Sequence, residues 1–184
     1  MYTEYVIEML FELMCKLNEY IKKKDMSDNE ECRVVFLKKI EGIVKNFKLC
    51  VKLFSCSNKN VQEKCAVIVI LMLQFISSVN EYKYEYKCRM WDVVFTSDNV
   101  VDLLKGLESP CVKIYKKIIK IFKWIIEYQY NAQDVLSPYK SYIKVYIEKI
   151  RDTSKDVDIV EVANRFLIND LNKIVVVHNN NNNN

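Results

Sequence analysis

The chain has 184 residues, of which 51% are hydrophobic and 28% charged, with two glycines and two prolines. So little Gly and Pro excludes a β-sandwich or a doubly wound fold, whose turns need them, and the hydrophobic share excludes a disordered chain. The net charge of +4 comes from lysine far more than from arginine, which favours a solvated surface over an arginine-based nucleic-acid reader.

The seven cysteines form no CxxC pair, and most occupy apolar positions of helical patterns. We interpret them as reduced, buried side chains in a reducing compartment. The only histidine is His178, so we expect neither a metal centre nor another cofactor. Glu4, Glu8 and Glu12 interrupt the first apolar stretch, which argues against a signal peptide. The expected location is therefore cytoplasmic.

The first predicted helix covers residues 4–24 and is amphipathic with a wide apolar face. Ser27 and Glu30 have the spacing of a capping box and open a second apolar pattern. That pattern continues as far as Phe54, as one long helix or two, until the polar stretch 55–60 ends it.

A buried helix is predicted over residues 61–79, with Asn60 as its cap. Its apolar run over 65–73 is too short to cross a bilayer, so we expect a helix that is covered on all sides and no membrane partner. The following tyrosine-rich patch, 80–91, alternates like a strand. No second strand pattern exists to pair with it, so we interpret it as a connector.

A short helix is predicted at about 98–107. The pairs Ser109–Pro110 and Ser137–Pro138 then each have the form of an N-cap followed by proline in the first turn of a helix. The last helix is predicted near 157–175. Residues 1–178 would form a single helical repeat domain, and the polyasparagine tail 179–184 would be disordered.

Predicted helix starts at Asn60, Ser97 and Ser137 are separated by intervals near 40 residues. Such a period is typical of armadillo and HEAT arrays, in which each unit buries its apolar face against the next. The predicted fold is therefore all-α, an armadillo/HEAT-like right-handed solenoid of about seven to nine helices.

One predicted helix, starting at Pro110, is strongly basic on one face. Its five lysines, at 113, 116, 117, 120 and 123, span an arc of roughly 120°, and apolar residues fill most of the rest. The simplest interpretation is a solvated face. The alternatives are a basic rim that meets an acidic protein surface, or contact with a membrane or nucleic acid. We expect no nucleic acid, because Trp124 is placed beside this face rather than on it.

Nothing in the sequence indicates catalysis. It has no Gly-rich phosphate loop, and the acids Asp156 and Asp158 precede a predicted helix, where capping and the helix dipole account for them. We therefore expect a protein that is not an enzyme.

Five segments in order resemble the C-terminal half of the MO-twenty-five family (calcium-binding protein thirty-nine, HymA-like). They are "NVQEKCAVIVILML", "DNVVDLLKGL", "SPCVKIYKKIIKIFKWII", "QDVLSPYKSYIKVYIEKI" and "VDIVEVANRFLINDLNKI". The family consists of armadillo-like scaffolds for sterile-twenty-type kinases and pseudokinases. The resemblance implies a non-catalytic adaptor that holds such a partner on a concave surface. It also implies a pocket for a short Trp-Glu-Phe tail.

By position, that pocket would have an apolar floor at Leu103 and Leu104 and a basic rim at Lys140 and Lys144. Lys123 matches the family within the preceding helix, and it completes the set of predicted partner-binding residues. Cys65 stands where the family has an arginine, with Lys64 adjacent, and this departs from the family at its main contact to the kinase domain.

Two other functions are compatible with the sequence. A Bcl-2-like bundle, of the viral type that modulates apoptosis or host signalling, would place the helix 61–79 at its centre. It would bind a partner helix in a groove. A basic surface-binding protein for nucleic acid or lipid would show affinity that falls steeply with salt.

Overall fold

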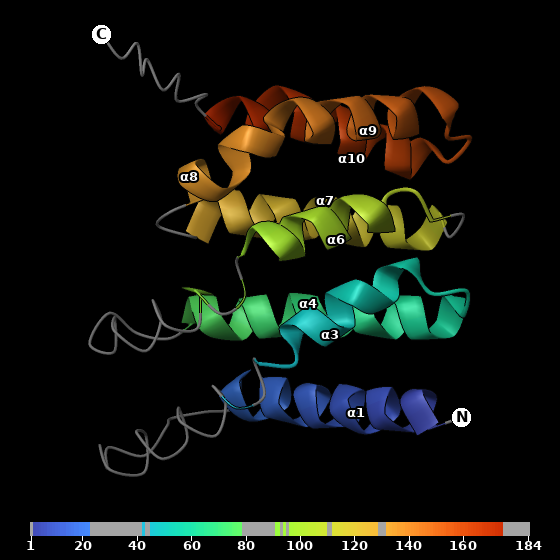
Figure 1. Ribbon diagram of the computed structural model, residues 1–184, viewed down its shortest axis with the longest axis vertical. Coiled ribbons are helices and arrows are strands. Elements are labelled where there is room, and N and C mark those ends of the chain that lie inside the picture. Colours follow the sequence, from blue (N-terminus) through green and yellow to red (C-terminus); the bar gives the residue numbers. More distant parts are fainter. Residues whose placement is uncertain are drawn as a thin grey trace, which may run out of the picture.

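The computed structural model describes residues 2–22, 42, 45–78, 91–92, 94, 96–109, 112–128 and 132–174. This part of the chain is all-α and contains no strand, as the sequence predicts (Figure 1). Several predicted features lie outside the described residues: the capping box at Ser27 and Glu30, most of the tyrosine-rich patch, Pro110 and the polyasparagine tail.

The described residues of the N-terminal half form two long helices with a short one between them. They are α1 (Tyr2–Lys22), α3 (Phe47–Lys52), which a 3-10 turn (Leu53–Ser55) extends, and α4 (Lys59–Ser78). Each matches an apolar pattern of helical period in the sequence, and the 3-10 turn that extends α3 ends at Ser55, where the polar stretch 55–60 begins, as expected.

The C-terminal half begins with α6 (Ser97–Gly106), α7 (Val112–Tyr128) and α8 (Ala132–Leu136). A 3-10 turn (Ser137–Tyr139) with Pro138 near its start leads into α9 (Lys140–Thr153). The last helix, α10 (Val157–Arg165), continues through a π turn (Phe166–Asp170) and a 3-10 turn (Leu171–Lys173). The predicted final helix is therefore one continuous segment whose winding changes along its length.

Side-chain caps define several helix starts. Asn58 Oδ1 accepts hydrogen bonds from the backbone N–H groups of Asn60 (3.0 Å) and Val61 (3.2 Å). The cap of α4 is thus Asn58, and the prediction of Asn60 was wrong by two residues. Thr96 caps α6, and Asp156 caps α10 by accepting from the N–H groups of Asp158 and Ile159.

The helices stack in layers along the long axis of the molecule (Figure 1). Going from the N-terminal end, the layers contain α1, then α3 with α4, then α6 with α7, and finally α9 with α10. The packing defines two columns: α1 contacts α4, which contacts α7, which contacts α10, while α3 contacts α6 and α6 contacts α9. Helices that lie far apart in this order, such as α1 and α9, are separated by whole layers.

The layers correct the predicted repeat. The starts at Asn60, Ser97 and Ser137 were treated as equivalent, but α4 belongs to one column and α6 and α9 belong to the other. The helices of this second column, α3, α6 and α9, begin at residues 47, 97 and 140, so their starts are unequally spaced. Apolar periodicity indicates where a helix lies but not to which column it belongs. For this reason the sequence pattern combined helices from both columns in one series.

The core follows the layers. Large side chains that are fully buried include Phe54, Phe122 and Phe166, and the rings of Phe122 and Phe166 are 6.5 Å apart across the α7–α10 seam. A buried polar contact joins two inter-helix turns: Gln62 Nε2 donates to Phe54 O (2.9 Å) and to Ser109 Oγ (3.0 Å). Both turns are thereby held against the start of α4.

α4 is the one helix in the described residues that is long and apolar enough, by length and composition alone, to cross a membrane. It qualifies over Lys59–Ser77, and 56% of that window is buried. The uninterrupted apolar run over residues 65–73 is too short to cross a membrane, as predicted. The complete helix is long enough to do so. Packing against α1, α3 and α7 covers most of its apolar surface, and the absence of a membrane partner stays a prediction.

Candidate functional site

The lysines of α7 connect this helix to both neighbouring layers. Lys113 Nζ lies 3.5 Å from Glu63 of α4, and Lys116 Nζ lies 3.2 Å from Asp158 of α10. Similar ion pairs join other layers, between Lys64 of α4 and Glu8 of α1 and between Lys48 and Asp98. Part of the basic face therefore forms ion pairs with the adjacent layers and is not merely a solvated surface.

The pair between α3 and α6 has an electrostatic consequence. Lys48 Nζ donates a hydrogen bond of 3.0 Å to Asp98 Oδ2, which lowers the pKa of this carboxyl below its usual value. Both side chains are largely exposed, at 49% and 73%. The pair therefore contributes little to stability.

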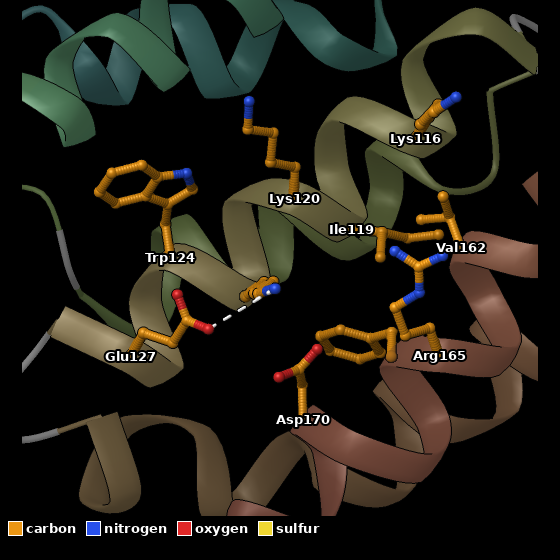
Figure 2. Close-up of a pocket in the computed structure, with 10 residues that line it drawn as sticks. Lys116, Ile119, Lys120, Trp124, Glu127, Val162, Arg165 and Asp170 are labelled. Atoms are coloured by element: carbon orange, nitrogen blue, oxygen red, sulfur yellow. Dashed lines mark ion pairs between the residues drawn. The ribbon is translucent and has the colours of Figure 1, made fainter.

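A groove with a volume of about 390 Å³ lies between α7 and α10. Its α7 side comprises Lys116, Ile119, Lys120, Lys123, Trp124 and Glu127. Its other side comprises Val162 and Arg165 of α10 with Phe166 and Asp170 of the π turn (Figure 2). Apolar side chains from both helices thus meet between rows of charged ones.

The groove floor arises because the two helices pack through their apolar stripes. Ile119 and Phe166 are almost fully buried, and Val162 is half-buried against the core. In Figure 2, Ile119 and Val162 face each other across the seam, with the Arg165 guanidinium beside them. A ligand in this groove would meet a hydrocarbon surface with positive charge at its edge.

Charge at the groove is mixed but basic in balance. Lys123 Nζ lies 3.6 Å from Glu127 Oε1, and Arg165 pairs with Glu161 one turn earlier. Asp170 is buried with a side-chain exposure of 6%, and Lys173 Nζ donates to it at 3.0 Å. Lys116, Lys123 and Arg165 each have an acidic partner, so among the described lining residues Lys120 is the basic side chain without an ion pair, and its charge favours an anionic group on a ligand.

The structure separates the five predicted partner-binding residues. Leu103 has no exposed surface, and Leu104 is 8% exposed, so α6 contributes them to the core. Lys140 Nζ donates to the backbone carbonyl of Ile174, and Lys144 lies 3.9 Å from Glu148 on the exposed side of α9. Only Lys123 of the five lines the groove.

The site residues that sequence reasoning missed come from α10. Val162 and Phe166 are four residues apart, and Arg165 stands between them. Their spacing was available from the sequence as one helical stripe. Periodicity alone does not show which helix packs against α10, so the sequence could not identify the other side of the groove.

No protein-family model, no curated protein and no solved structure matches this chain. The family resemblance drawn from the sequence therefore stays a prediction.

The described cysteines are free thiols. Cys50 of α3 and Cys65 of α4 are both fully buried, and the hydrogen bond between them, followed by burial, raises the pKa of the Cys65 thiol. Its thiolate form is thereby disfavoured. In the described part of the chain, no group of three or more His, Cys, Asp or Glu side chains is arranged to hold a metal ion.

Proposed function

We propose that the protein is a non-catalytic helical-repeat scaffold of the right-handed armadillo/HEAT type. Its partner would be a protein kinase or pseudokinase of the sterile-twenty type. The stack of helix layers supports the architecture, since successive layers bury their apolar faces against one another (Figure 1). Such a stack presents one continuous wall of helices to a partner.

The observation that carries the proposal is the groove between α7 and α10. It combines an apolar floor with a basic edge, which suits a short extended segment with an apolar side chain next to an acidic one. We therefore move the proposed peptide pocket from α6 and α9 to this groove. Lys123 is kept, and Arg165 takes over the role first assigned to Lys140 and Lys144.

The layered packing disfavours the Bcl-2-like alternative. A bundle of that kind would surround α4 with the other helices. Here α4 contacts α1, α3 and α7, and the layer of α9 and α10 lies beyond α7 (Figure 1).

A binding experiment with two charge-reversal variants tests the proposal. The double variant Lys123→Glu with Arg165→Glu places repulsive charge at the groove, and both side chains are exposed enough to leave the core intact. With a tagged full chain and a sterile-twenty-type pseudokinase that carries its C-terminal tail, we expect affinity to fall about tenfold or more. Titration calorimetry measures the loss.

A second variant, Lys140→Glu with Lys144→Glu, tests the position first derived from the sequence. The exposed pair Lys45→Glu with Lys59→Glu serves as the matched control, since it changes the charge equally in another layer. Circular dichroism and thermal melting check that all three fold. Loss only in the α9 variant would move the pocket back to α9, and unchanged binding in all three would refute the scaffold proposal.

A further inference from the structure

A straight stripe on α7 extends beyond the groove, which includes only Lys120 and Trp124 of it. Residues spaced three and four apart follow one side of the helix, namely Lys113, Lys117, Lys120, Trp124 and Tyr128. At 100° per residue they occupy an arc of about 80°, which corrects the expectation that Trp124 lies beside the basic face. Figure 2 shows Lys120 and Trp124 projecting to the same side of α7.

The two aromatic side chains of this stripe stack on each other. The ring centroids of Trp124 and Tyr128 are 4.6 Å apart, with 27° between the planes. Tyr128 is 45% exposed, and Trp124 is half-buried. An aromatic pair that is already stacked loses little conformational freedom when a planar ligand adds to it.

Positive charge along the stripe is available. Lys113 lies near Glu63, but among the residues that the structure describes neither Lys117 nor Lys120 has a carboxylate within salt-bridge distance. Lys117 donates only to the Lys113 carbonyl, at 3.5 Å. The stripe is about 22 Å long at 1.5 Å per residue, which is the length of about six stacked nucleotides at 3.4 Å each.

We propose that this stripe binds single-stranded nucleic acid, with the lysines on phosphates and Trp124 and Tyr128 as a stacking platform for bases. Lysine beside aromatic side chains on which bases can stack is the combination by which single strands are bound without sequence readout. An acidic peptide without aromatic side chains would pair with the lysines in the same way but would gain nothing from the aromatic pair. The proposed surface shares Lys120 and Trp124 with the groove, but the proposal rests on the aromatic stack and the lysines of the stripe and does not depend on the kinase scaffold.

Fluorescence anisotropy with a labelled 12-nucleotide oligo(dT) and a 12-nucleotide oligo(U) tests the proposal on the full chain. We expect Trp124→Ala to weaken binding about 5- to 100-fold, the range that loss of one stacked base spans. Trp124→Phe keeps an aromatic ring and should keep most of the affinity. Because Trp91 is buried, quenching of intrinsic fluorescence on binding should come from Trp124 and disappear in Trp124→Phe.

Salt dependence tests the lysines. Three phosphate contacts on a single strand predict a slope of about −2 for log K against log salt, and Lys117→Ala with Lys120→Ala should reduce its magnitude by about 1.4. The pair Lys45→Ala with Lys59→Ala removes equal charge elsewhere and should leave the slope nearly unchanged. No binding at 50 mM salt would overturn the proposal. So would equal affinity for polyglutamate, or binding that Trp124→Ala does not alter.

Discussion

Gly106 shows how closely two layers approach at a single residue. A Cβ atom on this glycine would lie 2.8 Å from Ile118 Cδ1 of α7 and 3.0 Å from Phe54 Cβ. The methyl end of Ile118 can move, but Phe54 Cβ is fixed to its backbone. No described glycine has a positive φ, so backbone conformation does not explain why a glycine is needed here. The reason is the close packing between three segments.

We predict that Gly106→Ala destabilises the protein by about 1–3 kcal/mol, the usual cost of overpacking a well-filled core. Gly42 is the matched control, since nothing lies within 4 Å of a Cβ added there. Gly42→Ala should have no cost or stabilise by up to about 1 kcal/mol through helix propensity. Urea unfolding of both variants measures the difference, and equal stabilities would contradict the close approach.

At the scale of the element, the start of α10 depends on a single side chain. Asp156 accepts from two backbone N–H groups, at 3.0 Å from Asp158 and 3.3 Å from Ile159. Asp158 in the first turn adds a favourable interaction with the helix dipole. Since α10 forms one wall of the groove, its capping also positions Val162 and Arg165.

We predict that Asp156→Ala lowers the free energy of unfolding by about 1 kcal/mol, the typical value of an N-cap. Asp152→Ala removes an exposed acid at the end of α9 and should change stability by less than about 0.5 kcal/mol. Thermal melts of both variants at neutral pH compare them. A loss in Asp152→Ala as large as in Asp156→Ala would argue against capping as the cause.

At the scale of the whole molecule, the layers differ in how much of their surface is covered. α4 and α7 lie inside the stack with a layer on either side, while α1 and the pair of α9 and α10 are end layers (Figure 1). In a linear stack, stability is approximately a sum over layers and the contacts between them, so end layers open at lower cost.

Amide hydrogen exchange followed by mass spectrometry should therefore be slowest in α4 and α7. α1, α9 and α10 should exchange faster, although α1, with 21 residues, is as long as α4, with 20. An equal exchange rate in all layers would indicate that the whole protein unfolds as one cooperative unit. It would contradict the prediction that stability is a sum of contributions from separate layers.

The sequence by itself determined the helices, because the apolar period, the caps and the prolines all act within a few residues. The start of α6, the Asp156 cap of α10 and the burial of α4 could be predicted for that reason. The stripe that joins Trp124 to the lysines was also present in the sequence, since the helical angle alone places it there, although the prediction missed it.

Only the tertiary structure decided which helices are neighbours. The family resemblance implies a pocket floor at Leu103 and Leu104, yet both side chains are buried in the core. The groove needs α7 beside α10, and these segments are joined by contacts between residues such as Lys116 and Asp158 that are 42 positions apart. Pairing of that kind depends on how apolar stripes from separate helices fit together, and local periodicity carries no information about the partner.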